Sequence, residues 1–236
     1  MNYTPLELAL MHADALYVHA ENNRLVRVNE PDPEDPAPRF FLFRTTSGNI
    51  WRTRYDLPPT LAAKLDTLAA SEPVISNPLG LREPPYHLAE YTELLNQDAP
   101  ISGTYAGPAY YLPELDPPHV AVTITPENLS LLEAHYPYTK KMYRELAPVV
   151  ALVVDGLAVA VCSSVRTTAE VAEAGVHTVG AYRGRGYAVE VVRGWAAAVR
   201  ATGRLPLYST WWENKASQAV AVSLDAVLYG VDFSIT

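Results

Sequence analysis

The stretch 183–204 concentrates the residues best suited to bind a phosphorylated ligand. It opens with Arg-Gly-Arg-Gly-Tyr-Ala and holds five arginines against one acid, Glu190, in a chain of net charge −8. Gly184 and Gly186 have no Cβ, so several backbone N–H groups can converge on an anion. A helix that begins behind this loop adds partial positive charge at its N-terminus. Composition alone leaves two interpretations open: a phosphate-binding loop, or a glycine turn with solvated arginines.

The neighbouring residues predict a strand before this loop and a helix after it. Alternation indicates a strand over Ala174–Val179, and helical periodicity follows over Val189–Thr202. A P-loop would need Gly-Lys-Ser/Thr at its end, and a Rossmann fingerprint would need a third glycine; the sequence has neither here. Only 48 residues follow Ala188, too few for the rest of a doubly wound sheet. Both common nucleotide-binding motifs are therefore excluded.

The residues 183–188 match the signature Arg/Gln-x-x-Gly-x-Gly/Ala, and through it the range 119–236 resembles the GNAT superfamily of acyl-CoA-dependent N-acetyltransferases. The preceding strand and the later Asn214-Lys215-Ala216-Ser217 stand in that family's order. The resemblance implies an α/β fold, with a GNAT-type mixed sheet flanked by helices in the C-terminal half. It also implies that the protein moves an acetyl group from acetyl-CoA to a primary amine by direct attack in a ternary complex.

The resemblance further implies which residues bind acetyl-CoA. Backbone groups of Val176, His177 and Thr178 would pair with the pantetheine amides, and Asn214 would contact the pantetheine arm. Backbone amides of the loop and helix start would hold the pyrophosphate, while two arginines would shape the loop or approach phosphate. The residues concerned are Arg183, Gly184, Arg185, Gly186, Tyr187, Ala188 and Val189.

Two residues are the main candidates for the base that accepts a proton from the amine. Glu173 begins the central strand, where some family members place a base; a solvated strand-edge role is the alternative. His177 shares its face by period-two alternation, and histidines ordinarily titrate near neutral pH; a packed, hydrogen-bonded role is the alternative. Glu170 is a weaker third candidate. The predicted catalytic residues are therefore Glu173 and His177.

The proton donor for the leaving thiolate is where the sequence departs from the family. Many members carry a tyrosine seven residues after the asparagine, and Ala221 stands there. Water or another tyrosine would then donate the proton. Cys162 lies in an apolar run, which predicts a buried thiol without a nucleophilic role. Of Trp211 and Trp212, one would pack in the core and the other could line an acceptor site.

The two halves of the chain differ in composition. Residues 1–118 hold 16 acidic and 8 basic residues, whereas 119–236 hold 10 of each. We therefore expect an acidic, proline-rich α+β region over 1–118 and a GNAT-like catalytic domain over 119–236. The acidic region would help to select a cationic acceptor such as a polyamine, an aminoglycoside-like amine or a basic peptide N-terminus. The alternative is that it only covers the second half.

Short elements broken by proline are expected in the first half, and longer ones in the second. The segment 100–118 is interpreted as a crossover or linker because it is rich in Gly, Pro and Tyr, and Asp155-Gly156 predicts a hairpin. The second half has the expected order β-α-α-β-β-β-loop-α-β-α. The first half is expected to hold helices over Pro5–Leu16, Pro59–Ala70 and Tyr86–Leu95, and hairpins formed by Leu16–Ala20 with Leu25–Val28 and by Arg39–Thr45 with Asn49–Arg54.

Composition also excludes several classes of function. The chain has 236 residues, 49% of them hydrophobic, so it can bury a core, but no apolar run approaches the roughly 18 residues of a membrane span. Its acidity disfavours nucleic acid, and its single cysteine rules out a disulfide framework. No residue cluster has metal-ligand spacing. We expect a cytoplasmic protein without metal, nucleic acid or membrane partner. An acyl-CoA-sensing module and an interaction scaffold remain as non-enzymatic alternatives.

Overall fold

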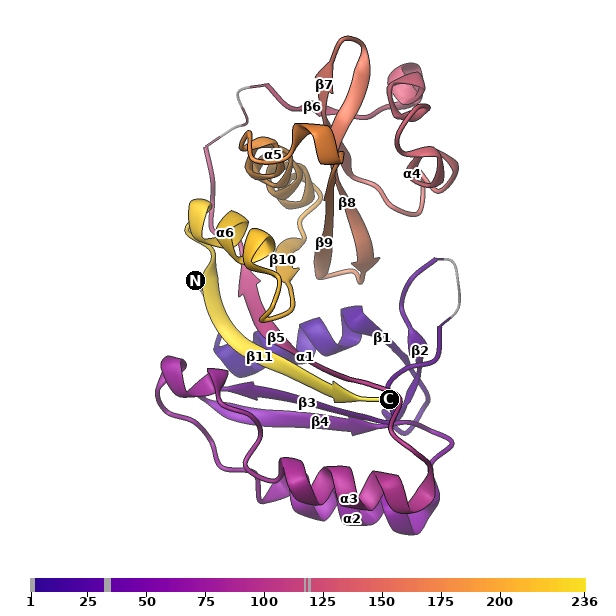
Figure 1. Ribbon diagram of the computed structural model, residues 1–236, viewed down its shortest axis with the longest axis vertical. Coiled ribbons are helices and arrows are strands. Elements are labelled where there is room, and N and C mark those ends of the chain that lie inside the picture. Colours follow the sequence, from indigo (N-terminus) through magenta and orange to yellow (C-terminus); the bar gives the residue numbers. More distant parts are fainter. Residues whose placement is uncertain (1–2, 32–34, 117, 119) are drawn as a thin grey trace. The chain divides into compact units, whose positions relative to one another are not determined.

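The computed structural model describes residues 3–31, 35–116, 118 and 120–236 (Figure 1). The chain forms two compact units. The first comprises Met1–Tyr110, Ser209–Asn214 and Leu228–Thr236, and the second comprises Tyr111–Tyr208 and Lys215–Val227. Each unit combines strands with flanking helices, which confirms the α/β class (Figure 1). A domain boundary was expected near residue 118. Residues 117 and 119 lie outside the described residues, so this boundary stays a prediction.

The first unit is built on strands in the order β4-β3-β11-β5, beside a small sheet of β1 and β2. Both β4 and β11 run antiparallel to β3. Its elements are α1 (Pro5–Leu16), β1 (Tyr17–His19), β2 (Leu25–Val28), β3 (Phe40–Thr45), β4 (Gly48–Thr53), α2 (Pro59–Ala70), the 3-10 helix η1 (Pro78–Arg82), α3 (Leu88–Asp98), β5 (Thr104–Tyr111) and β11 (Val227–Ile235).

Strand β3 is buried along its whole length because helices cover both of its faces. Phe40 and Leu42 pack with Leu65 of α2 and Leu95 of α3. On the other face the ring of Phe43 lies 5.7 Å from that of His12 in α1. The first-half helices and hairpins expected from the sequence are therefore confirmed, with α3 beginning two residues later than predicted.

Two strands of the first unit were not predicted from the sequence. The segment 100–118 was expected to be a crossover or linker without a strand, yet it contains β5, and no strand was expected where β11 runs. The expectation fails at 104–111 because strands that are distant in the sequence pair with β5. Gly107 permits a close approach of backbone there, since a Cβ would lie 1.8 Å from the carbonyl oxygen of Thr210. The chain at 210–212 bonds back to β5, since the N–H of Trp212 donates to Ala106.

The second unit has the strand order β10-β9-β8-β7-β6. Only β10 and β9 are parallel, and the remaining pairs are antiparallel. Its elements are β6 (Val122–Thr123), the 3-10 helix η2 (Pro126–Leu132), α4 (Pro137–Lys141), β7 (Val149–Val154), β8 (Leu157–Thr167), β9 (Val171–Thr178), the 3-10 helix η3 (Gly180–Tyr182), α5 (Tyr187–Ala201), β10 (Leu205–Ser209) and α6 (Lys215–Ser223).

Helices cover both faces of this second sheet near its centre (Figure 1). Helix α5 buries Trp195, whose Nε1–H donates to the Oγ of Ser164 on β8 at 3.0 Å. The segment η2–α4 packs Leu132 and Tyr136 against β7 and β8. The element order predicted for the second half is confirmed as far as α6, although its first helix is a 3-10 helix and the unpredicted β11 follows α6. No helix among the described residues is both long and apolar enough to cross a membrane.

Candidate functional site

The loop between β9 and α5 holds two glycines in the left-handed region of backbone conformation. Gly184 has φ +74° and Gly186 has φ +78°. A Cβ at either position would meet no atom within 4 Å. Glycine is therefore favoured by the backbone conformation and not by crowding. Gly186 is also the N-cap of α5, and no side chain caps this end of the helix.

This loop presents a row of free backbone donors. Across the fully described stretch 184–188, the five consecutive N–H groups make no hydrogen bond, whereas the N–H of Val189 donates to the oxygen of Gly186 at 3.0 Å. The first N–H groups of a helix have no partner within it, and a left-handed turn before the helix converges further donors on the same point. The geometry therefore fits an anion of the size of a phosphate or pyrophosphate.

Arg183 and Arg185 are each tied to the backbone near the loop. The Nε of Arg183 donates to the oxygen of Thr178 at 3.1 Å, and the Nη2 of Arg185 donates to Ala181 at 3.2 Å. The Arg185 guanidinium also lies 5.2 Å from the centre of the Tyr182 ring. Both arginines are exposed. These contacts hold the loop in shape, and the remaining guanidinium N–H groups add positive charge beside it.

Strands β9 and β10 separate shortly before the loop. Their parallel pairing joins Leu205–Leu207 only to Val171–Glu173, although β9 continues to Thr178. On its other edge β9 stays paired with β8 as far as Thr178. In this described part of the chain, the edge of β9 that faced β10 is therefore no longer paired with β10 beyond Ala174.

The strand register decides which backbone groups face that open edge. The N–H of Val179 donates to Val159 on β8, whereas the oxygen of Glu170 accepts from Leu205 at the start of β10. Backbone groups alternate between the two edges of a strand. Even-numbered residues therefore face the open edge, where Val176 offers an N–H and a C=O. The backbone groups of His177 point toward β8 instead.

Glu173 lies at the point where β9 and β10 part. It is only 2% exposed, and its Oε2 is 2.7 Å from the Nη1 of Arg166. A bulge in β8 between Ser164 and Arg166 brings Arg166 opposite Glu173. The alternative of a solvated edge residue is wrong, because the carboxylate is buried in an ion pair. The sequence analysis missed Arg166, since nothing local marks the bulge.

His177 lies on the same face of β9 as Glu173, with a hydrophobic side chain between them. A Cβ at Gly175 would lie 2.2 Å from the Cγ1 of Val165, so Val165 fills the place of the missing side chain. His177 is exposed, and its ring meets that of Tyr136 edge-on at 5.6 Å. His177 was alternatively expected to be packed; the structure shows packing where its ring meets Tyr136, while the residue as a whole is exposed.

The remaining candidate residues each lie within one of the two units. Cys162 is buried, as predicted, and burial raises the pKa of its thiol well above the ordinary value. Asn214 belongs to the first unit, so its contact with pantetheine stays a prediction. In that unit Trp211 is 52% exposed against Tyr105, and Arg82 lies over Trp212. No group of three or more possible metal ligands occurs among the described residues.

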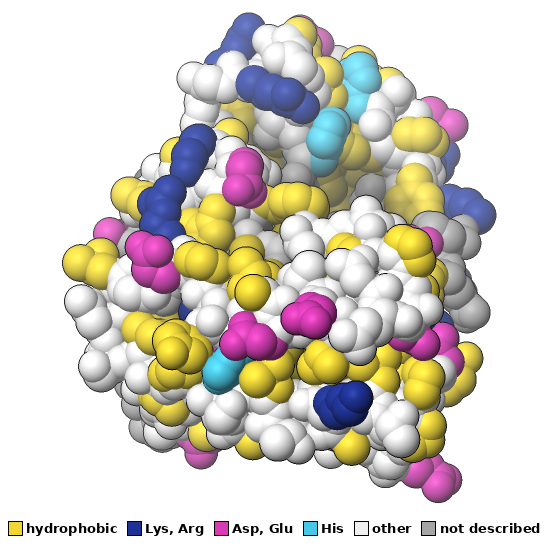
Figure 2. Space-filling model, turned by 60° about the horizontal axis from the view of Figure 1, so that its bottom comes forward, with side chains coloured by type: hydrophobic (Ala, Val, Ile, Leu, Met, Phe, Trp, Pro, Cys, Tyr) yellow, Lys and Arg dark blue, Asp and Glu magenta, His cyan; other side chains and the backbone are white. Residues whose placement is uncertain are grey.

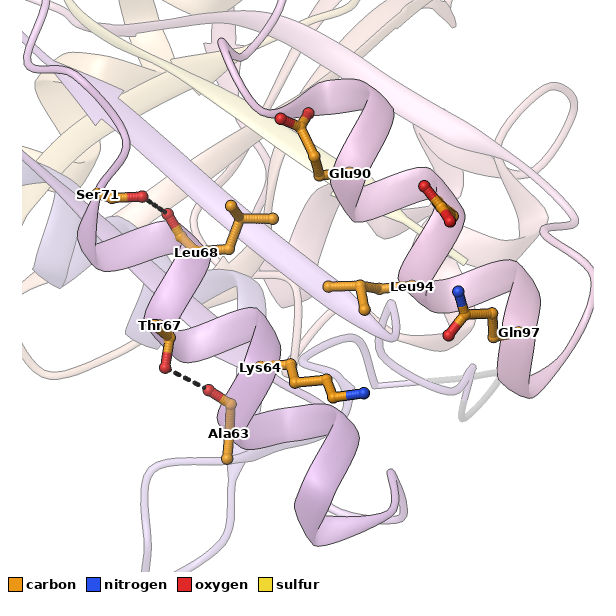
Figure 3. A pocket seen from close by; sticks show the side chains of 9 residues that line it. Ala63, Lys64, Thr67, Leu68, Ser71, Glu90, Leu94 and Gln97 are labelled. Atoms are coloured by element: carbon orange, nitrogen blue, oxygen red, sulfur yellow. Dashed lines mark hydrogen bonds between the residues drawn. The ribbon is translucent and has the colours of Figure 1, made fainter.

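The first unit carries a groove between α2 and α3 that the sequence analysis did not foresee. It has a volume of about 650 Å³. Leu68 and Leu94 point into the space between the helices, with Lys64, Glu90 and Gln97 around them (Figure 3). On this side of the molecule acidic side chains border hydrophobic ones (Figure 2). Ser71 and Glu90 of this groove are linked through His87, whose Nε2 lies 3.1 Å from the Oγ of Ser71 and whose Nδ1 lies 3.4 Å from an oxygen of Glu90. The hydroxyl of Ser71 also donates to the oxygen of Leu68 at 2.7 Å.

No family model matches the sequence, and no curated protein is similar to it. Part of the chain resembles solved structures. One is described as an acetyltransferase of the GNAT family from Novosphingobium aromaticivorans, with 20% identity, a TM-score of 0.46, and 57% of this chain and 65% of that chain covered. A second, a GNAT-family acetyltransferase from Colwellia psychrerythraea, has 17% identity, a TM-score of 0.43 and 62% of both chains covered.

A third is described as a GCN5-related N-acetyltransferase-like protein from Streptococcus suis, with 14% identity, a TM-score of 0.46 and 85% of both chains covered. The chain thus spans less than two thirds of the length of the first two. The resemblance to the GNAT superfamily stated from the sequence recurs, over part of the chain, among solved structures.

Proposed function

We propose that the protein is an N-acetyltransferase that transfers an acetyl group from acetyl-CoA to a primary amine. The observation that carries the proposal is the combination, within one unit, of the five free N–H groups at 184–188 and the open edge of β9 that leads to them. Acetyl-CoA has the matching chemistry, because a pyrophosphate is joined to a long arm that contains amide groups. An ordinary glycine turn would account for the loop but not for the unpaired strand edge beside it.

Each part of the site has a role in binding this substrate. The backbone N–H groups from Gly184 to Ala188 would hold the pyrophosphate, with Arg183 and Arg185 adding charge. The N–H and C=O of Val176 would bond to amides of the pantetheine arm as a further strand would. The arm would then run along β9 toward Glu173, which places the thioester near the point where β9 and β10 part.

The reaction requires a neutral amine and a protonated thiol. A base takes a proton from the ammonium, and the amine nitrogen attacks the acetyl carbon. A C–N bond forms and the C–S bond breaks; the nitrogen loses its second proton, and the thiolate gains one. Glu173 is the proposed base because of its place on β9, and Arg166 stabilises its charged form. His177 is the exposed second candidate. Water is the proposed donor to the thiolate, since Ala221 carries no proton to give.

The acceptor is proposed to be a cationic amine. Residues 1–118 carry all of the excess negative charge, with 16 acidic against 8 basic residues. A negative field concentrates ammonium compounds and steers them to a site. Linear polyamines, aminoglycoside-like amines and basic peptide N-termini all meet this requirement, and a panel of them is the appropriate set to assay.

A second candidate function is an acyl-CoA sensor without catalysis. Two observations favour it: the carboxylate of Glu173 is engaged by Arg166, and Ala221 replaces a hydroxyl that could donate a proton. Calorimetry with acetyl-CoA followed by thiol release with the amine panel separates the two functions. Binding with turnover supports the transferase, and binding without turnover on any amine supports the sensor. Absence of binding would overturn both and leave the interaction scaffold.

A further inference from the structure

Tyr136 lies immediately before α4, with its phenol directed at the ends of two strands. It is 7% exposed, and its hydroxyl is 3.0 Å from the oxygen of Val159 on β8 and 3.1 Å from the oxygen of His177 on β9. A phenol has one proton to donate, so the two carbonyl oxygens share it. The hydroxyl thus bridges β8 and β9 where β9 approaches the glycine loop.

The two bridged carbonyls belong to the last rungs of the β8–β9 ladder. The oxygen of Val159 already accepts the N–H of Val179 at 2.9 Å, and His177 is paired with Val161. The ring of His177 packs edge-on against the Tyr136 ring. Burial raises the pKa of Tyr136 to about 12, so the phenol keeps its proton in the neutral range.

The same segment of β9 has lost its partner on the opposite edge. Beyond Glu173, β10 no longer pairs with β9, so β8 alone holds the strand. A strand paired on one edge only, next to a loop, opens more readily than a central strand. A bond from Tyr136 across this end compensates for the missing pairing and keeps Val176 directed at the open edge.

We propose that the Tyr136 hydroxyl is a positioning group that fixes the open end of β9 for the pantetheine arm. This inference rests on the proposed function, because it assigns the purpose of the fixed edge to acetyl-CoA. Tyr136 is not a catalytic residue here; it acts through the backbone of β9. The expected consequence of its loss is weaker binding of acetyl-CoA with an unchanged chemical step.

The chain supplies a matched control in Tyr143. Its hydroxyl also donates to a backbone oxygen, that of Ile124, at 3.0 Å, and its ring packs in the same hydrophobic cluster as Tyr136. Within the described structure Tyr143 makes no hydrogen bond to β9, and each Tyr→Phe change removes one oxygen. The test compares Tyr136→Phe with Tyr143→Phe in the full chain. It measures acetyl-CoA affinity by calorimetry, KM and kcat, and hydrogen exchange of the N–H groups of Gly175, His177 and Val179.

Tyr136→Phe is expected to weaken acetyl-CoA binding and raise its KM by about threefold to tenfold, the effect of one net hydrogen bond, with kcat within about twofold of the natural chain. Exchange at the three β9 amides should quicken. Tyr143→Phe should leave both measurements unchanged. Equal effects of the two variants, or no effect of Tyr136→Phe, would overturn the inference. If the natural chain binds no acetyl-CoA, the proposed function fails, and the exchange data still decide whether Tyr136 fixes β9.

Discussion

Gly186 and Gly203 are located at opposite ends of α5 in nearly the same backbone conformation. Their φ values are +78° and +84°, and a Cβ at either would meet no atom within 4 Å. The strain of a side chain should therefore be similar at the two positions. Of these two glycines, only Gly186 lies among the free N–H groups at 184–188. Comparing substitutions at the two positions therefore distinguishes the effect of backbone strain from the effect on ligand binding.

Gly186→Val is expected to abolish acetyl-CoA binding while the fold is kept. The branched side chain would cover the N–H groups that should receive the pyrophosphate. Gly203→Val should destabilise the protein by a similar amount, about 1–2 kcal/mol, and leave binding intact. Calorimetry gives the affinity and circular dichroism monitors folding. A folded Gly186→Val protein that binds acetyl-CoA within threefold of the natural chain would refute the phosphate loop.

Glu173→Gln is expected to lower turnover by about 10²–10⁴-fold, because a positioned base contributes that much, and to change acetyl-CoA affinity far less. The substitution keeps the size of the side chain and removes its charge. Glu170→Gln is the comparison, since it makes the same change at the weaker candidate, which is exposed and lies immediately before β9. Steady-state rates with a responsive amine across pH 6–9 decide the matter. Unchanged rates in Glu173→Gln would remove Glu173 from the mechanism.

At the scale of elements, the site depends on a strand that is paired on one edge and held by a neighbouring segment on one face. β9 keeps β8 along its length, loses β10 after Glu173, and meets Tyr136 near its end. The bulge at Val165 has two effects. The side chain of Val165 fills the space at Gly175, and the shift in register brings Arg166 opposite Glu173. The β8–β9 ladder is therefore the element whose stability bears most directly on the site.

The pH dependence of stability should report on this ladder. The folded state raises the pKa of Tyr136 from 10.0 to about 12 because burial disfavours the phenolate. Tyr136 therefore contributes stability that is full below pH 10 and is lost as the pH rises toward 12. Denaturant unfolding from pH 9 to pH 12 should show a fall in the free energy of unfolding that is smaller in Tyr136→Phe. Identical pH profiles for both proteins would contradict this assignment.

At the scale of the whole molecule, the chain does not divide into units at a single point. The last strand, β11, pairs with β3 through Val231–Ile235 and Phe40–Arg44, so the end of the chain completes the first unit. Phe233 and Ile235 are buried in the same cluster as Phe40 and Leu42. A division of labour between 1–118 and 119–236 therefore has to be tested in the full chain.

A fragment that begins at residue 117 is expected to be insoluble or aggregated. It keeps β11 but lacks both of its neighbours, β3 and β5, so a long strand with two open edges and exposed Phe233 and Ile235 would result. Size-exclusion chromatography and circular dichroism on the fragment and the full chain provide the measurement. A soluble, folded monomer with the full affinity for acetyl-CoA would show instead that residues 119–236 form an independent domain.

The sequence by itself determined the elements whose signals are local. Helix α1 has its capping box of Thr4 and Glu7, the β7–β8 hairpin has Asp155-Gly156 with positive φ at both, and the glycine loop precedes an amphipathic α5. Each of these depends on residues within a few positions of one another, so spacing and residue type were enough.

Only the tertiary structure decided the rest. β5 and β11 are strands because distant segments pair with them, and the parting of β9 from β10 is a matter of register that no local pattern encodes. The same holds for the bond from Tyr136 to His177, which joins residues 41 positions apart. Contacts between distant residues form only when the whole chain folds. The candidate site combines such contacts of β9 with the glycine loop at 183–188, whose signal is local.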